Sequence, residues 1–229
     1  LRELDSSSDN ELSRWIWELI QNAKDCSDYR ICFLPDKSNQ NHEPKLVDIR
    51  IIYTNDNIVI FKHNGFPFTK YTLDSLMYKY STKNGENEGT GRFGTGFMTS
   101  HTLSRIVEIK APYLDYNGTR IITATVFREG RSINQLEEEF YKMENSKSLI
   151  NYDNNNEEHK WTSFKYKINN ETGEKSLHLG IKSFRNNIIK TLLFCPEIRS
   201  IQLNDEEPYE YQLISSLKYV NNIFPNPID

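Results

Sequence analysis

The chain has 229 residues, with 28 basic and 32 acidic side chains and a formal net charge of −4. This length is enough to bury a hydrophobic core and makes one domain the default. The lack of a basic excess argues against direct nucleic-acid binding by electrostatic attraction. The three cysteines show no metal-ligand spacing, and no apolar run is long enough to span a membrane. We therefore expect a cytoplasmic domain with reduced thiols and no membrane contact.

In chain order, the first expected helix covers residues 10–27, where apolar side chains recur at helical spacing. Two strands follow, at 46–53 and 57–63, joined by the turn "TNDN". A short helix at 72–80 then leads into a glycine-rich segment, and a further helix over 95–103 begins within the end of that segment. The sequence begins "LRELDSSSDN" without methionine, so we expect a domain of a longer polypeptide.

The second half of the chain mixes strands and helices without strict alternation. Its expected elements are strands at 105–111 and 119–127, a charged exposed helix at 134–145, a strand at 161–168, a helix at 181–194 and a strand at 198–203. Polar residues at 36–44 and 151–160 predict loops. The sequence therefore favours an α+β fold in which helices cover one face of a mostly antiparallel sheet.

The glycine-rich segment contains "GTGRFGTGFMTS", and five of the ten glycines lie between Gly85 and Gly96. Unhindered backbone N–H groups before a helix start are typical of a phosphate site, and a flexible surface loop is the alternative. A dinucleotide fingerprint is excluded because a polar loop precedes the glycines instead of a buried strand. A protein-kinase loop is excluded because no H-R-D or D-F-G motif follows Lys110.

The first helix carries a polar ridge in the sequence "WELIQNAKD". At about 100° per residue, Glu18, Asn22 and Asp25 share one side of the helix, beside its apolar stripe. A carboxylate and an amide one turn apart can orient water and hold a divalent cation, and their oxygen atoms suit Mg²⁺. The alternative is an amphipathic helix whose polar ridge is simply solvated.

Three motifs in this order, "ELIQNAKD", "HNGFPFT" and "GRFGTGF", resemble the N box, G1 turn and G2 box of the GHKL superfamily. That superfamily includes large heat-shock chaperones, DNA gyrase B subunits and histidine kinases, and the details are closest to its chaperone-like and sacsin-like branch. "ENEGTGRF" is similar to part of the ATP lid, and "WTSFKY" is similar to a later strand that contacts the base. The resemblance covers residues 8–204, so we expect an ATP-binding domain over 1–204 and an extension or linker over 205–229.

The resemblance implies the Bergerat fold, a two-layer α/β sandwich with a glycine-rich ATP lid and the nucleotide between helices and sheet. It places Glu18 at the general base that activates water and Asn22 at the Mg²⁺ ligand. Lys83, in "STKNG", could reach a phosphate from the lid, and a solvated lid lysine is the alternative. The nucleotide-contacting positions that it implies are Asn22, Asp25, His63, Asn64, Gly65, Lys83, Gly91, Arg92, Phe93, Gly94, Thr95, Gly96, Phe97 and Thr162.

The G1 turn departs from the family pattern at two positions. His63 stands where the family usually has an aspartate that accepts from the adenine amino group, and Pro67 replaces a glycine. Neutral His63 can accept a hydrogen bond only if a neighbour fixes its tautomer, and protonated His63 cannot accept one. We therefore expect ATP affinity to fall as the pH is lowered through about 6.5, where an ordinary histidine becomes protonated. Asn64 is a second candidate to read the base. Alternatively, His63 only ends its strand, and backbone groups, Asp25, Thr162 and water read the base.

These observations predict a Mg²⁺-dependent domain that binds ATP and hydrolyses it slowly, driving conformational change in a larger protein. Chaperone-like and defence-related roles both follow from the branch that the motifs resemble. The expected partners are a nucleotide, further domains of the same polypeptide and a nucleotide-dependent homodimer. The alternative function is a nucleotide-sensing module without significant turnover.

Overall fold

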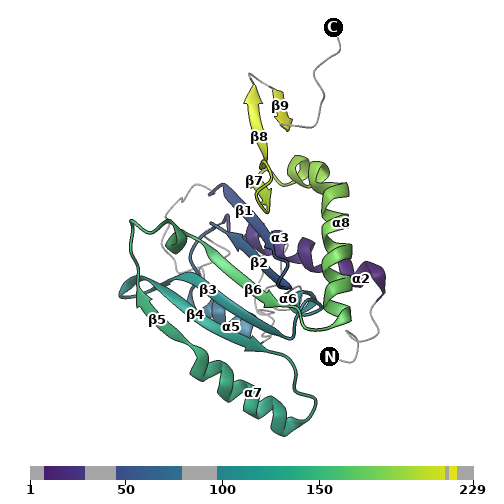
Figure 1. The fold of residues 1–229 in the computed structure, drawn as a ribbon. Coiled ribbons are helices and arrows are strands. Elements are labelled where there is room, and N and C mark those ends of the chain that lie inside the picture. Colours follow the sequence, from purple (N-terminus) through teal and green to yellow (C-terminus); the bar gives the residue numbers. More distant parts are fainter. Residues whose placement is uncertain (1–7, 29–44, 79–96, 215–216, 221–229) are drawn as a thin grey trace, which may run out of the picture.

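The computed structural model describes residues 8–28, 45–78, 97–214 and 217–220 (Figure 1). In this part of the chain nine strands form one sheet, in the order β5-β4-β3-β6-β2-β1-β7-β8-β9. Neighbouring strands are antiparallel except β1 and β7, which are parallel. The strands are β1 (Val47–Tyr53), β2 (Ile58–His63), β3 (Ile106–Asp115), β4 (Gly118–Phe127), β5 (Ser148–Asn151), β6 (Thr162–Lys167), β7 (Ile198–Leu203), β8 (Tyr209–Ile214) and β9 (Leu217–Val220).

The helices of the described residues differ widely in length. They are α2 (Asp9–Ser13), α3 (Trp15–Asp25), α5 (Lys70–Tyr78), α6 (Phe97–Ser100), α7 (Ile133–Ser146) and α8 (Glu171–Phe194), with one 3₁₀ turn, η1 (Glu157–Lys160). Within the described ranges no helix is long and apolar enough to cross a membrane. As predicted, α7 is a charged helix that is mostly exposed, and its buried side chains are Glu139 and Met143.

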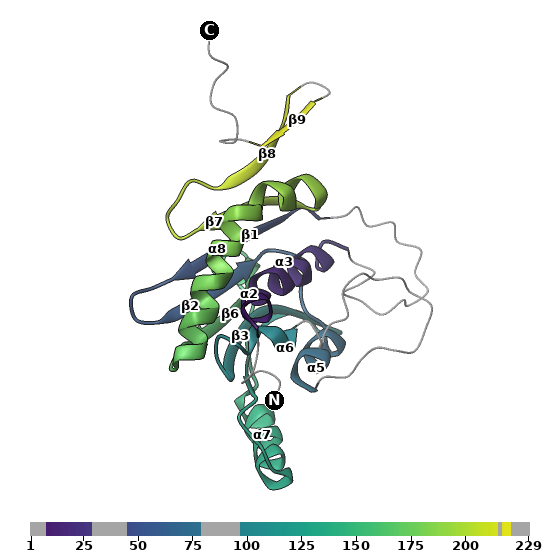
Figure 2. The same cartoon turned by 90° about the vertical axis from the view of Figure 1, so that its right-hand side faces the viewer.

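Alternation along the central strands separates an apolar face from a charged one. On β2 and β6 the side chains of Phe61 and Phe164 are buried, whereas Lys62 and Lys165 on the other face form ion pairs with Glu158 and Glu108. Helices α2, α3 and α8 contact one another over the apolar face, as the side view shows (Figure 2). The predicted α+β class and the mixed, mostly antiparallel sheet are therefore confirmed.

The predicted first helix is divided into two. Ser8 caps α2 and forms a capping box with Glu11, and α3 begins directly after Arg14. Helix α8 begins ten residues earlier than predicted. Two glycines in its first half weaken helix propensity, but both are needed for close packing against neighbouring elements. A Cβ on Gly180 would lie 2.1 Å from Nε1 of Trp15, and a Cβ on Gly173 would lie 2.4 Å from the Leu103 carbonyl oxygen.

Other differences concern short elements. Helix α6 covers four residues where the sequence predicted a helix over 95–103, and a turn follows it. Strands β5, β8 and β9 and the turn η1 were not predicted. Strand β8 pairs with β7, so part of the segment expected to be an extension or linker continues the sheet. The predicted glycine-rich lid lies outside the described residues.

Candidate functional site

The polar ridge of α3 is only partly exposed. The Glu18 side chain is 17% exposed, and Oε1 accepts a hydrogen bond from Nη2 of Arg14 at 2.8 Å. Asn22 and Asp25 are buried, at 6% and 3% exposure. The ridge therefore faces the protein interior over its last two turns, which disfavours the fully solvated alternative.

Asn22 carries a buried polar atom, the amide nitrogen Nδ2. Its Nδ2 makes no hydrogen bond to any of the described residues. A buried donor left unpaired costs about 1–3 kcal/mol, so such an atom calls for an explanation. An amide side chain offers one oxygen to a cation and two N–H donors to a phosphate, and both chemistries fit the Mg²⁺-nucleotide position that the motif implies.

Asp25 follows Asn22 by almost one helical turn and titrates abnormally. Burial raises the pKa of its carboxyl to about 6, a net result that includes a lowering by the charge of Lys24 and a smaller raising by the charge of Glu197. A carboxyl in this range changes charge near neutral pH and can therefore respond to a hydrogen-bond donor placed beside it.

The turn after β2 packs against the end of α3. A Cβ on Gly65 would lie 2.6 Å from Cβ of Cys26, so only glycine fits at this contact. The backbone N–H of Phe66 also donates to the carbonyl oxygen of Cys26 at 2.8 Å. Lys45 binds the same turn from the side, since Nζ donates to the carbonyl oxygen of Gly65 at 3.3 Å. These contacts bring the motif of α3 next to the motif that begins at His63.

His63 is a buried, neutral residue on the helix-facing side of the sheet. Its Nδ1 accepts a hydrogen bond from the backbone N–H of Gly65 at 3.3 Å. Burial lowers the pKa of His63 to about 3, and the positive charge of Lys45 adds to this effect. Protonation near pH 6.5, which the sequence led us to expect, is therefore wrong for the folded protein.

Thr162 lies directly opposite His63 in the register of β2 and β6. Its hydroxyl oxygen is buried and has no hydrogen-bond partner among the described residues. Aromatic rings pack beside this pair, with the ring centroids of His63 and Phe97 at 6.2 and 5.5 Å from that of Phe164. Phe97 is the first residue of α6, which contacts α3. Four predicted positions, Asn22, His63, Thr162 and Phe97, thus lie on elements that meet at one end of the sheet.

Asn64 is directed elsewhere. Its Oδ1 accepts from the backbone N–H of Asp48 at 2.7 Å, and its Nδ2 donates to Oδ2 of Asp48 at 2.8 Å. Sequence reasoning did not identify Asp48, whose only signal was an acidic residue on the outward-facing positions of β1. The structure therefore gives the Asn64 amide an anchoring contact, which does not bring it to the helix-facing group of residues.

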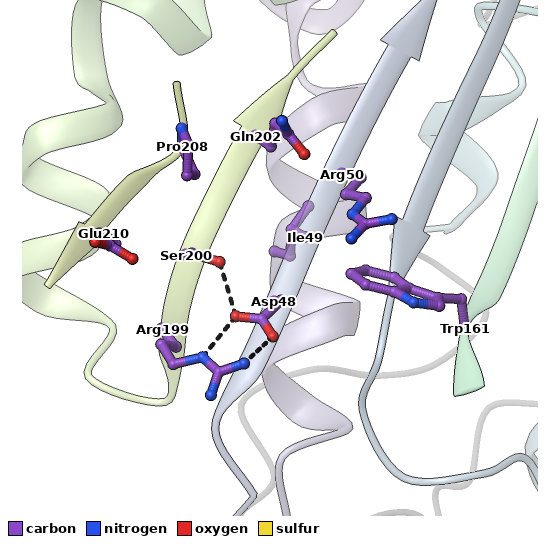
Figure 3. Close-up of a pocket in the computed structure, with 9 residues that line it drawn as sticks. All are labelled: Asp48, Ile49, Arg50, Trp161, Arg199, Ser200, Gln202, Pro208 and Glu210. Atoms are coloured by element: carbon purple, nitrogen blue, oxygen red, sulfur yellow. Dashed lines mark hydrogen bonds and ion pairs between the residues drawn. The ribbon is translucent and has the colours of Figure 1, made fainter. Parts of the chain in front are cut away.

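Asp48 belongs to a pocket of about 380 Å³ on the charged face of the sheet (Figure 3). Oδ1 of Asp48 accepts from Nε of Arg199 at 2.8 Å and from the Ser200 hydroxyl at 2.7 Å. Burial of the Asp48 carboxyl raises its pKa, but the hydrogen bonds from Arg199 and Ser200 outweigh this, so the pKa lies below its usual value. Across the pocket, Cζ of Arg50 lies 4.3 Å from the ring centroid of Trp161.

Several predicted positions lie outside the described residues, namely Lys83, Gly91, Arg92, Phe93, Gly94, Thr95 and Gly96. Within the ranges that the structure describes, no group of three or more His, Cys, Asp or Glu side chains is placed to hold a metal ion. A magnesium ion at Asn22 would accordingly take most of its oxygen ligands from phosphate and water, as this cation commonly does.

Comparison of the chain with known protein families and with curated protein sequences gave no significant match.

Proposed function

We propose that this chain is a GHKL-type domain that binds ATP with Mg²⁺ and hydrolyses it slowly to drive conformational change in a larger cytoplasmic protein. The observation that carries the proposal is the buried, unpaired amide nitrogen of Asn22, one turn before the point where α3 packs on the turn of Gly65. Phosphate oxygens of a bound nucleotide would accept from this nitrogen, which has no partner among the described residues, and the amide oxygen of Asn22 would bind the cation. Chaperone-like and defence-related roles, and a nucleotide-dependent homodimer, belong to the same proposal.

Each residue of the ridge has a distinct role in this proposal. Asn22 holds the metal–phosphate end of the ligand, and bound Mg²⁺ supplies positive charge against the phosphate oxygens. Glu18, one turn earlier, takes the proton from an attacking water molecule. Asp25 and Thr162 are buried beside the turn of His63 and Gly65, where they contact the base or the water around it.

The contact between Glu18 and Arg14 favours a second candidate, a nucleotide-sensing module without significant turnover. Arg14 occupies one oxygen of the carboxylate that would act as the base. In the ATPase, Arg14 must leave this oxygen or hold the carboxylate in place while the other oxygen binds water. In the sensing module, the ion pair persists after the nucleotide has bound.

Steady-state release of ADP, measured with wild type, Glu18→Gln and Arg14→Ala, separates the two candidates. Loss of a general base typically lowers a rate by about 10²–10⁴-fold, so Glu18→Gln should abolish turnover and leave the ATP dissociation constant within a few-fold. Glu137→Gln, at an exposed position of α7, is the matched control. Equal turnover in wild type and Glu18→Gln would remove Glu18 as the base. ATP binding with no turnover in any variant would leave the sensing module, and no calorimetric binding of ATP would overturn the proposal.

A further inference from the structure

The pocket on the charged face of the sheet has a floor of groups that bind one another (Figure 3). The Asp48 carboxylate accepts from Arg199 and Ser200 there, and the guanidinium of Arg199 balances its charge. A volume of about 380 Å³ is enough for a small ligand. What the pocket can bind therefore depends on the side chains at its two ends, Arg50 and Glu210.

Arg50 forms the positively charged end of the pocket. Its Cζ lies 4.3 Å from the ring centroid of Trp161, an indole that is only 8% exposed. The ring holds the guanidinium in place, but none of the guanidinium N–H groups donates to another of the described residues. The nearby carboxylate of Glu158 is bound by Lys62 instead, at 2.6 Å. An arginine held by an aromatic ring with its donors unoccupied suits a carboxylate, which it can bind through two parallel hydrogen bonds.

Glu210 forms the opposite, negatively charged end. Its carboxylate makes no hydrogen bond or ion pair within the described part of the chain, although its charge acts on Arg199 at longer range. In the register of the sheet Glu210 lies opposite Ser200 on β7, whereas Arg50 lies opposite Gln202, two residues further along. With strands about 4.8 Å apart and about 3.3 Å per residue, the Cα atoms of Arg50 and Glu210 are about 12 Å apart. Two charges of opposite sign therefore face one pocket at a separation that the sheet fixes.

Gln202 supplies a third group between these ends. Its Nε2 donates to the carbonyl oxygen of Glu206 at 3.2 Å, which fixes the amide and leaves Oε1 to accept a hydrogen bond. A ligand that meets all three groups has a carboxylate for Arg50, an N–H donor for Gln202 and a cation for Glu210. After about 3 Å for a hydrogen bond at each end, the two charges of this ligand lie about 6 Å apart. The termini of an extended dipeptide have this separation, since each residue spans at most about 3.5 Å.

We propose that this pocket binds peptides of two or three residues with free termini. Arg50 binds the terminal carboxylate, Oε1 of Gln202 accepts from the peptide N–H, and Glu210 binds the terminal ammonium. The charges at the two ends give selectivity, because Glu210 repels a simple anion and Arg50 repels a simple cation. The site lies on the face of the sheet away from His63, so it does not depend on the proposed nucleotide binding.

Proton–nitrogen correlation spectra of wild type titrated with alanylalanine, in the absence of nucleotide, test the proposal. The chain has three tryptophans, and the indole N–H groups of Trp15 and Trp17 donate to Ser176 and Ser183 of α8, on the other face of the sheet. Because Arg50 stacks on Trp161, the Trp161 indole signal should shift as the peptide binds, while the other two stay unchanged. Trp161→Phe assigns the signal.

Blocking either terminus of the peptide should weaken binding about tenfold, the order expected for one charge-assisted contact. N-acetyl-alanylalanine lacks the ammonium, and alanylalanine amide lacks the carboxylate. In Glu210→Gln, alanylalanine and its acetylated form should bind with equal affinity. In Arg50→Gln, alanylalanine and its amide should bind with equal affinity. Lys190→Gln on α8 and Glu137→Gln on α7, both at exposed positions, should behave as wild type.

The results that would overturn the proposal are all obtained with wild type, so they do not depend on how a variant folds. A Trp161 signal that does not respond to alanylalanine would show that the pocket does not bind the dipeptide. Equal affinity for alanylalanine and its acetylated form, or an equal response to sodium acetate, would show a site for anions in which Glu210 has no role. None of these outcomes bears on ATP binding, which is measured separately.

Discussion

Two polar clusters lie on opposite faces of the sheet, and the turn after β2 belongs to both. The outer cluster consists of Asp48, Asn64, Arg199 and Ser200, and the inner cluster consists of Asn22, Asp25, His63 and Thr162. In the outer cluster the Asp48 carboxylate accepts hydrogen bonds from all three of its neighbours. In the inner cluster the amide nitrogen of Asn22 and the hydroxyl of Thr162 have no partner in the part of the chain that the structure describes.

The two clusters differ in whether the described residues themselves supply the hydrogen-bond partners. Paired polar groups stabilise a fold, whereas an unpaired buried group costs about 1–3 kcal/mol and is retained where something else supplies its partner. A pocket of about 380 Å³ lies at the outer cluster, yet the groups there already bind one another. Pocket volume and unpaired buried polar groups therefore point to opposite faces of the sheet. The Ser176 hydroxyl also has no partner among the described residues, but it lies on α8 beside Trp15 and serves below as a reference.

The largest effect is expected from Asp25, because its charge is the most costly part of the inner cluster. Its pKa is about 6 in the folded protein against an ordinary value of 3.8. The folded state thus holds its proton more tightly, so this contribution to stability is complete below pH 4 and is lost as the pH rises to about 6. A shift of this size corresponds to about 3 kcal/mol.

Asp25→Asn should remove that pH dependence and unfold at higher urea concentration than wild type at pH 7.5. Urea titrations at pH 4.5, 6 and 7.5 provide the measurement, and Asp56→Asn, in an exposed turn, is the control. A wild-type stability that does not fall between pH 4.5 and 6 would show that burial does not penalise the Asp25 charge.

Removing the carboxylate charge of the outer cluster should lower stability, whereas removing that of Asp25 should raise it. Asp48→Asn keeps the shape of the side chain but loses the charge that binds Arg199 and Ser200, so we expect a loss of about 2 kcal/mol in the free energy of unfolding. Urea unfolding at pH 7.5 with an unchanged m-value would measure it. A loss below about 0.5 kcal/mol would mean that the hydrogen bonds of this cluster contribute nothing to the fold.

The sequence could predict a relation between two cluster residues only where they lie close together along the chain. Helical periodicity predicted that Glu18, Asn22 and Asp25 share one side of a helix, because that relation is local. The register that places His63 opposite Thr162 joins residues about a hundred positions apart, and no local signal contains it. The resemblance to a family, and not the periodicity, connected those two residues in advance.

The contact between Asn64 and Asp48 shows the same limit. Asn64 was a candidate to read the base, because an amide has both donors and acceptors. The pairing of the antiparallel strands β1 and β2 brings Asp48 beside the turn, and this contact decides where the Asn64 side chain points. Tertiary packing also overrode local preference in α8, where Gly180 weakens helix propensity but makes room for Trp15.

Two asparagines offer a matched pair of variants, one from each cluster. Asn64→Ala loses two hydrogen bonds to Asp48 and should lower the free energy of unfolding by about 1–2 kcal/mol. Asn22→Ala loses no observed bond of its Nδ2 atom and should change stability less, but it should abolish the Mg²⁺ dependence of ATP binding measured by calorimetry. If Asn22→Ala were the more destabilising variant and left the Mg²⁺ dependence intact, Asn22 would stabilise the fold and would have no role in binding the metal.

The smallest effect is expected from Thr162→Val, which replaces a hydroxyl with a methyl group of similar size. Val suits a β-strand, and the change removes a buried oxygen that has no partner among the described residues, so we expect stability to rise by about 1 kcal/mol. In a chain of this length that corresponds to about 2–4 °C in melting temperature. Ser176→Ala removes a comparable hydroxyl from α8 and should stabilise similarly. Only Thr162→Val should also weaken ATP binding. Equal ATP affinity in both variants would mean that the unpaired hydroxyl of Thr162 marks no ligand site.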